Sequence, residues 1–179
     1  MLSKETSCLV LIDVQGKLAE MVHDSDVLVK NIERLVQAAK IFDVPVVWLE
    51  QYPKGLGPTV ASIAAHLPNQ TPIEKIEFDA CLNAEFMVRL NELDRKQVVV
   101  CGIEAHICVF QTAAHLKELG YHVEAVVDAV SSRTAANKAI GLDKMKAYGV
   151  LPTSTESVIY ELMKKAGTPE FKQVLPLIK

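Results

Sequence analysis

The stretch Cys8-Leu9-Val10-Leu11-Ile12-Asp13 is a continuous apolar run that ends in an acid. The stretches Val44-Pro-Val-Val-Trp-Leu-Glu50 and Gln97-Val-Val-Val-Cys-Gly102 repeat this form. Such runs are typical of strands buried on both faces, as in a parallel sheet covered by helices on each side. Residues 122–127 and the short Gly149-Val-Leu-Pro152 predict two further strands.

Segments with apolar residues near 3.6-residue spacing alternate with these strands and predict helices. They cover residues 27–42, 84–93, 109–119, 135–148 and 155–166. Right-handed crossovers place successive helices against the faces of a parallel sheet, so the alternation predicts an α/β fold with helices on both sides. Functional residues are then expected at the carboxyl ends of the strands. Residues 51–71, rich in Pro and Gly, predict a long loop with a short helix near residues 60–66.

Length and charge narrow the class of protein. With 179 residues, half of them hydrophobic, the chain is predicted to form one domain spanning residues 1–179. A net charge of -3 with interspersed acids and bases offers no basic face for nucleic acid and no polybasic membrane segment. The apolar runs are far shorter than the roughly 20 residues that span a bilayer. We therefore expect a soluble, cytoplasmic protein that acts on a small molecule, without nucleic-acid or membrane partners.

The cysteines are widely spaced and form no CxxC pair, so free thiols in a reducing compartment are expected. A lone Cys is usually a small buried hydrophobe, and Cys81 and Cys101 are assigned to the core. Cys108 is different, because it lies just after a predicted central strand, at the start of the next helix. Backbone N–H groups at a helix start favour a thiolate and can stabilise an oxyanion. A buried packing role explains the position equally well.

Two charged residues also lie at predicted strand ends. Asp13 follows the first strand and is either a functional carboxylate or a cap for the following turn. Lys75, in Pro72-Ile-Glu-Lys-Ile-Glu-Phe-Asp79, lies between apolar residues and is either a functional ammonium or an exposed edge lysine. A doubly wound sheet would bring Asp13, Lys75 and Cys108 to one edge.

Three motifs together resemble the isochorismatase-like hydrolase superfamily over nearly the whole chain. They are Leu-Ile-Asp13-Val-Gln15, Glu-Lys75-Ile-Glu-Phe78-Asp-Ala and Gly102-Ile-Glu-Ala-His106-Ile-Cys108-Val. The loop Glu50-Gln-Tyr-Pro-Lys-Gly-Leu-Gly-Pro58 is most similar to the isochorismatase-domain-containing subgroup. The resemblance implies a three-layer α/β/α fold with a six-stranded, mainly parallel, Rossmann-like sheet. It also implies a homo-oligomer.

The family's triad maps by resemblance to Asp13, Lys75 and Cys108. Asp13 is then the base that accepts the thiol proton, Lys75 stabilises charge, and Cys108 attacks a carbonyl to form a covalent acyl intermediate. The same resemblance implies a cis peptide at Ile103–Glu104 that aims the N–H groups of Glu104 and Cys108 at the oxyanion. It further suggests a substrate pocket shaped by Gln15, Tyr52, Phe78 and His106. Phe78 is equally explained as core, and His106 as a polar residue that helps to cap a helix.

Departures from the family's subgroups refine this prediction. Nicotinamidases carry an Asp-x-His cluster that binds a metal, whereas the matching stretch here is Glu50-Gln51-Tyr52-Pro53 and contains no imidazole. We therefore expect no metal and no cofactor. Isochorismatases that cleave a vinyl ether lack a nucleophilic cysteine, so Cys108 favours acyl chemistry on an amide-like C–N bond. The alternatives are vinyl-ether hydrolysis, a redox role for Cys108, and a non-catalytic binding or scaffold protein that keeps the fold.

Overall fold

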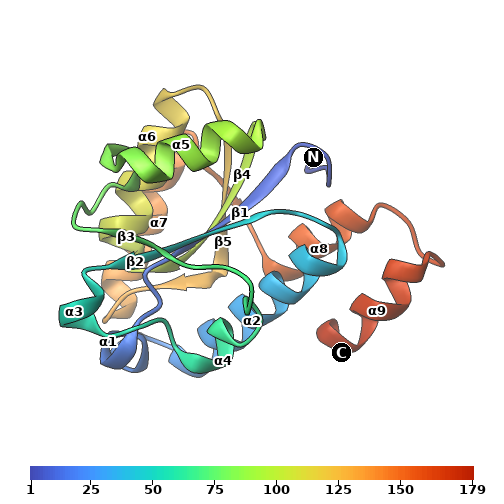
Figure 1. Cartoon of the computed structure of the whole chain (residues 1–179), viewed down its shortest axis with the longest axis horizontal. Helices are drawn as coiled ribbons and strands as arrows, with labels where there is room; N and C mark the ends of the chain where they lie inside the picture. Colours follow the sequence, from blue (N-terminus) through green and yellow to red (C-terminus); the bar gives the residue numbers. More distant parts are fainter.

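The computed structural model describes all residues, 1–179, as a three-layer α/β/α sandwich around a six-stranded parallel sheet (Figure 1). The strand order is β3-β2-β1-β4-β5-β6. The strands are β1 (Ser7–Ile12), β2 (Val46–Gln51), β3 (Ile73–Lys75), β4 (Gln97–Ile103), β5 (His122–Ser131) and β6 (Leu151–Thr153). The predicted α/β class and parallel sheet are therefore confirmed.

Helices cover both faces of this sheet, as the alternating pattern predicts. The helices are α1 (Gly16–Met21), α2 (Ser25–Ile41), α3 (Pro53–Leu56), α4 (Ala61–Ala64), α5 (Ala84–Leu93), α6 (Phe110–Glu118), α7 (Ala135–Ala147), α8 (Thr155–Met163) and α9 (Pro169–Ile178). Two short turns of other kinds are the 3-10 turn η1 (Ala80–Leu82) and the π-helical turn η2 (Ala105–Val109). Figure 1 shows α5, α6 and α7 on one face, and α2, α8 and α9 on the other.

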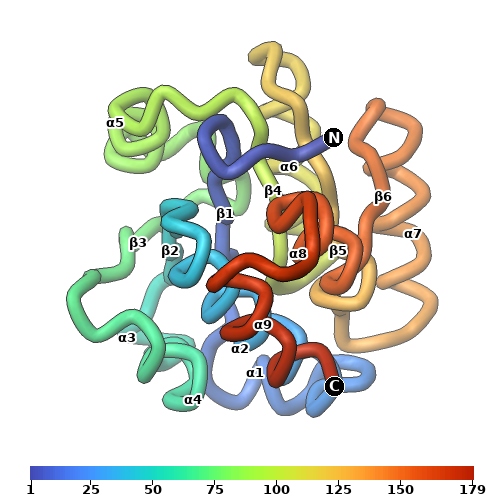
Figure 2. Tube along the Cα trace, turned by 90° about the vertical axis from the view of Figure 1, so that its right-hand side faces the viewer, coloured from blue at the N-terminus to red at the C-terminus, as the bar shows by residue number.

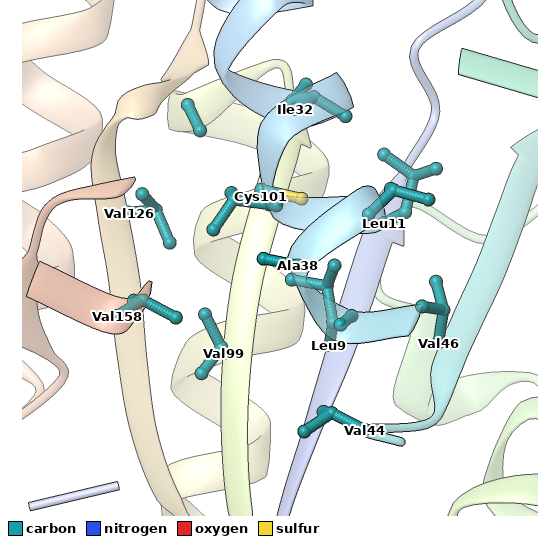
Figure 3. Packing of buried hydrophobic residues seen from close by; sticks show 14 of the residues in the cluster. Leu9, Leu11, Ile32, Ala38, Val44, Val46, Val99, Cys101, Val126 and Val158 are labelled. Atoms are coloured by element: carbon teal, nitrogen blue, oxygen red, sulfur yellow. The ribbon is translucent and has the colours of Figure 1, made fainter. Parts of the chain in front are cut away.

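Two hydrophobic clusters lie on opposite faces of the sheet. Along β1, Leu9 and Leu11 belong to the cluster under α2 and α8, and Cys8, Val10 and Ile12 belong to the cluster under α5 and α6. Successive side chains of a strand point to opposite faces, so a strand apolar at every position must be covered twice. Figure 3 shows the first cluster, with Val99 and Cys101 of β4 facing Ala38 of α2.

The sequence missed several short elements. Helices α1 and α3 were not predicted, and the carboxyl-terminal tail, left unassigned, forms α9, which packs against α2 and α8 (Figure 2). Strand β5 runs to Ser131, beyond the predicted end at residue 127, because the ladder with β4 shifts register and then resumes. Cys81 and Cys101 are buried core residues, as predicted. None of the helices combines the length and apolar character that crossing a lipid bilayer requires.

Candidate active site

The three predicted catalytic residues all lie at the carboxyl edge of the sheet. Asp13 directly follows β1, Lys75 is the last residue of β3, and Cys108 lies in η2 after β4. Strand order reverses between β1 and β4, since the chain builds outward to β3 on one side and to β6 on the other. Such a switch point is where open α/β sheets place their sites. All three residues are buried, with exposed fractions of 2%, 2% and 7% respectively.

Lys75 and Asp13 form a buried ion pair. Lys75 Nζ lies 2.7 Å from Asp13 Oδ2, and it also donates to Gln51 Oε1 at 2.7 Å and to the Glu77 carbonyl at 3.1 Å. An ammonium group has three donors, and here each has an acceptor. Lys75 is therefore not an exposed edge lysine but a fixed internal cation.

The second oxygen of Asp13 is left without a conventional partner. Asp13 Oδ1 is the only buried side-chain nitrogen or oxygen without a hydrogen-bond partner. The Cys108 thiol lies near this carboxyl, and its interaction with the carboxylate lowers the pKa of Asp13. A buried carboxylate oxygen without a partner is free to accept a proton from a neighbouring thiol, as a general base for Cys108 would.

Burial dominates the electrostatics of this pair. It raises the pKa of Asp13, against the lowering effect of the Lys75 charge. It also raises the pKa of Cys108 to about 12, with Asp13 adding to the rise and Lys75 opposing it. With a pKa of about 12, the Cys108 thiol keeps its proton at neutral pH, and the positive charge of Lys75 is placed to compensate one negative charge on the pair.

The expected thiolate-favouring effect of a helix start is therefore wrong for the resting protein. Cys108 does not begin an α-helix, because η2 precedes α6 and places the residue in a π-helical turn. Desolvation outweighs any favourable backbone dipole there and raises the pKa of the thiol. A thiol in this state becomes a nucleophile only when a neighbouring base removes its proton.

The turn before Cys108 is fixed by several contacts. The Ile103–Glu104 peptide is cis, and the Glu104 carbonyl accepts hydrogen bonds from the N–H groups of Ile107 and Val109. The N–H of Glu104 itself makes no backbone hydrogen bond. The Glu104 carboxylate accepts from the N–H and Nε of Arg133, at 3.0 and 3.1 Å. These contacts tie η2 to the end of β5.

The residues suggested as pocket lining have different surroundings. Tyr52, 54% exposed, lines a cavity of about 390 Å³ that reaches Lys75. Gln15 is fully buried, and it hydrogen-bonds Gln51 and Gly57 rather than facing a cavity. Phe78 is 57% exposed, so its alternative assignment to the core is wrong. His106 does not cap the helix, since Nδ1 lies 2.9 Å from Ser132 Oγ.

Two places bear on metal binding. Glu50, at the position that matches the nicotinamidase metal cluster, is buried, and Oε1 accepts from the N–H and Oγ1 of Thr59 at 2.6 and 2.7 Å. Elsewhere, three possible metal-ligand atoms lie within 4.8 Å of one another, one each from Asp79, Cys81 and His115. There, Asp79 Oδ1 accepts from the Cys81 N–H and Oδ2 lies 2.7 Å from His115 Nδ1, so both oxygens already have protein partners. These contacts join η1 to α6.

Three residues of the site were not predicted from the sequence. Gln51 contacts Lys75, Ser132 contacts His106, and Arg133 contacts Glu104. Each is polar and lies at or just after the carboxyl end of a strand, β2 for Gln51 and β5 for Ser132 and Arg133. A polar residue at the carboxyl end of a buried strand is therefore the signal that would have found them.

Comparison with known proteins identifies the family. Residues 7–157 match the isochorismatase domain. A protein of Phytophthora sojae named secreted isochorismatase effector Isc1 is 38% identical over 97% of this chain and 85% of its own. Isochorismatase domain-containing protein 2 of Danio rerio is 37% identical over 99% of this chain and 89% of its own.

Solved structures agree with this relationship. A Caenorhabditis elegans structure described as MAR1 ribonuclease superposes with a TM-score of 0.93 at 36% identity, covering 99% of this chain and 91% of that one. The Escherichia coli YcaC gene product, described as an octameric hydrolase of unknown specificity, has a TM-score of 0.92 at 24% identity, covering 98% and 89% of the two chains. The chain belongs to the isochorismatase family of hydrolases.

Proposed function

We propose that this chain is a metal-independent cysteine hydrolase that cleaves an amide-like C–N bond of a small molecule. The observation that carries the proposal is that the two carboxylate oxygens of Asp13 have different surroundings. One oxygen holds Lys75 at 2.7 Å, the other is buried without a hydrogen-bond partner, and the Cys108 thiol lies near enough to lower the pKa of the carboxyl. This arrangement pairs a nucleophile with a base that is itself oriented by a third group, which is the general pattern of covalent catalysis.

The reaction begins when Asp13 Oδ1 takes the thiol proton and Cys108 Sγ attacks the substrate carbonyl carbon. The Glu104 and Cys108 N–H groups receive the developing oxyanion, and Lys75 balances the negative charge that moves between sulfur and carboxylate. When the C–N bond breaks, the leaving nitrogen takes the proton from Asp13. Water then attacks the thioester and gives a proton to Asp13. The C–S bond breaks, the acid product leaves, and Asp13 returns the proton to the Cys108 sulfur. Water is the only co-reactant, and atoms and charge balance.

The cavity of about 390 Å³ beside Lys75 has the size for a small substrate, although of the three triad residues only Lys75 lines it. Its lining is mixed, with Tyr52, Lys54, Glu74 and Asn83 among the residues at the wall. The net charge of -3 offers little attraction for a polyanion, so we do not extend the ribonuclease description of the C. elegans protein to this chain. A homo-oligomer, as in the octameric YcaC structure, and a reducing cytoplasmic location for the four free cysteines complete the proposal.

Intact-protein mass spectrometry tests the acyl intermediate. We expect a panel of small amides, carbamates and ureas to include members that leave an acyl adduct on wild type and on Cys81→Ala, but not on Cys108→Ala. Cys81 is the matched control, because its exposed fraction of 8% is close to the 7% of Cys108. An adduct that persists in Cys108→Ala, or a wide panel without adduct or turnover, contradicts the proposal. The second outcome favours either a non-catalytic scaffold protein or vinyl-ether hydrolysis. An assay with isochorismate distinguishes these two, because only the hydrolase would turn it over.

Metal independence predicts that a chelator leaves the reaction unchanged. The Glu50 carboxylate accepts two hydrogen bonds from Thr59. No histidine lies beside Glu50 in the stretch that matches the metal cluster of nicotinamidases. Dialysis against EDTA, followed by measurement of adduct formation, should give the rate of the untreated protein. A loss of rate that Zn²⁺ or Mn²⁺ restores would contradict this part of the proposal.

A further inference from the structure

The fold places Gln51 between two members of the triad. Lys75 ends β3 and Asp13 follows β1, while β2 lies between these strands. Lys75 must therefore extend past the end of β2 to reach Asp13. Gln51, the last residue of β2, is the register partner of Lys75 in the β2–β3 ladder. Side chains at partnered positions stand on the same face of a sheet, roughly 5 Å apart at Cβ. The Gln51 carboxamide is consequently the group beside the path of the lysine.

The orientation of the Gln51 carboxamide is determined by its two partners. Oε1 accepts from Lys75 Nζ at 2.7 Å, and Nε2 donates to the Ile76 carbonyl at 2.6 Å. An ammonium group only donates and a carbonyl only accepts. If the amide were turned around, its NH₂ group would face the Lys75 ammonium and its oxygen would face the Ile76 carbonyl, and neither pair could hydrogen-bond. The amide oxygen therefore points to Lys75.

The backbone of Gln51 is held as firmly as its side chain. The Gln51 N–H donates to Gln15 Oε1 at 2.6 Å, and the Gln51 carbonyl accepts from Gln15 Nε2 at 3.1 Å. Gln15 is fully buried and Gln51 is 9% exposed. This explains why Gln15, suggested as a pocket residue, lies next to the triad without facing a cavity. It fixes the strand end from which Gln51 reaches the ammonium.

The neutral charge of Gln51 matters as much as its shape. Of the three acceptors around Lys75 Nζ, only Asp13 is ionic, and the others are the Gln51 amide oxygen and the Glu77 carbonyl. Glu50, the adjacent carboxylate, is engaged by Thr59 instead. Asp13 is thus the only carboxylate that hydrogen-bonds the Lys75 ammonium. Three other carboxylates lie near enough to act through their charge: Lys75 helps to lower the pKa of Glu77, Glu50 helps to raise that of Asp13, and Glu104 helps to raise that of Cys108.

We infer that Gln51 is a positioning residue that holds the Lys75 ammonium on Asp13 Oδ2 without adding charge, and so leaves Asp13 Oδ1 to the Cys108 thiol. The inference rests on the proposed function for the role of the thiol as nucleophile. The hydrogen bonds that define the position of Gln51 do not depend on any substrate. Gln51, at the end of β2, is thus added to the site that Asp13, Lys75 and Cys108 form.

The test is the pH dependence of Cys108 alkylation by iodoacetamide in Gln51→Glu. The substitution keeps the size of the side chain and its acceptor for Lys75, but adds a negative charge beside the triad. A like charge raises the pKa of a thiol, so at each pH from 7 to 10 Cys108 alkylation should be about tenfold slower than in wild type, which displaces the profile by about one pH unit. Gln70→Glu is the control, because Gln70 is exposed and the charge change is identical. The alkylation profile of Gln70→Glu should be the same as that of wild type.

Urea unfolding shows first whether each variant is folded. If Gln51→Glu does not fold, Gln51→Met replaces it in the test. Met supplies no acceptor for the ammonium, so Cys108 alkylation should slow toward the rate of Lys75→Met. A folded Gln51→Glu with the profile of Gln70→Glu, or a Gln51→Met alkylated as fast as wild type, overturns the inference. Because iodoacetamide needs no natural substrate, this result is independent of the acyl-adduct experiment. Failure of that experiment alone would instead remove the proposed hydrolysis.

Discussion

Replacing Asp13 by Asn is expected to lower turnover of a small amide by about 10²- to 10⁴-fold, the range typical for loss of a general base. The same variant should be alkylated at Cys108 faster than wild type near neutral pH. The two effects have opposite signs because Asp13 does two things to the thiol. In the proposed reaction it accepts the proton during attack, and its negative charge raises the pKa of Cys108 in the resting protein.

Asparagine keeps the shape of the side chain and removes only the charge and the basic oxygen. The Lys75 ammonium then has no carboxylate partner in the triad, and its charge lowers the pKa of Cys108 without opposition from Asp13. The thiolate consequently forms at a lower pH, although no group remains to move the proton to the leaving nitrogen. Turnover and the pH profile of iodoacetamide alkylation measure these two consequences separately.

Asp143→Asn is the matched control, since Asp143 is an exposed aspartate on α7 and the change of charge is identical. It should change neither turnover nor alkylation. If Asp13→Asn retained turnover, Asp13 would not be the base. If turnover and alkylation fell together in a folded variant, Asp13 would act by holding the shape of the site and not by its charge.

The sequence predicts Asp13, Lys75 and Cys108 for a physical reason. Parallel strands buried on both faces are apolar throughout, so a charged or reactive residue at the carboxyl end of such a strand stands out. The same regularity predicts the sheet and its covering helices. The pairing of residues across strands has no comparable signal, because it depends on register. Gln51 and Lys75 become partners only when β2 and β3 align.

The surroundings of Cys108 show a second limit of sequence reasoning. Apolar spacing predicts the helix over residues 109–119, which forms as α6, but it gives no sign of the π-helical turn η2 that precedes it. The direction of the thiol pKa follows from how fully the turn buries the sulfur and how close Asp13 lies. Both depend on contacts between segments far apart in the chain. Short elements such as α3, with four residues, contain too few positions to show a helical period.

Replacing Lys75 by Met is expected to lower the free energy of unfolding at pH 7 by about 3–5 kcal/mol, the usual cost of removing one partner from a buried ion pair. Met fills much of the same volume, so the main loss is the charge. Asp13 would remain as a buried carboxylate without its cation, and Gln51 Oε1 and the Glu77 carbonyl would each lose a donor. Urea unfolding measures the change, with Lys30→Met, an exposed lysine on α2, as control.

The pH dependence of this loss distinguishes charge from packing. Burial already raises the pKa of Asp13 in wild type, and Lys75 opposes the rise. Without Lys75 the folded-state pKa climbs further above the value in the unfolded chain. The folded protein then binds more protons than the unfolded chain between these two values, so its stability increases as pH falls through the folded pKa. The deficit of Lys75→Met relative to wild type should therefore be largest at alkaline pH and shrink toward acid.

Removing the uncompensated charge should reverse the loss. The double variant Asp13→Asn, Lys75→Met carries neither member of the ion pair, and a neutral pair of similar volume often costs little compared with a single buried charge. We therefore expect the double variant to be more stable at pH 7 than Lys75→Met alone. A deficit that is equal at every pH and unchanged in the double variant would mean that Lys75 contributes by packing. The ammonium would then not be the fixed charge that balances Asp13 and, during attack, the Cys108 sulfur.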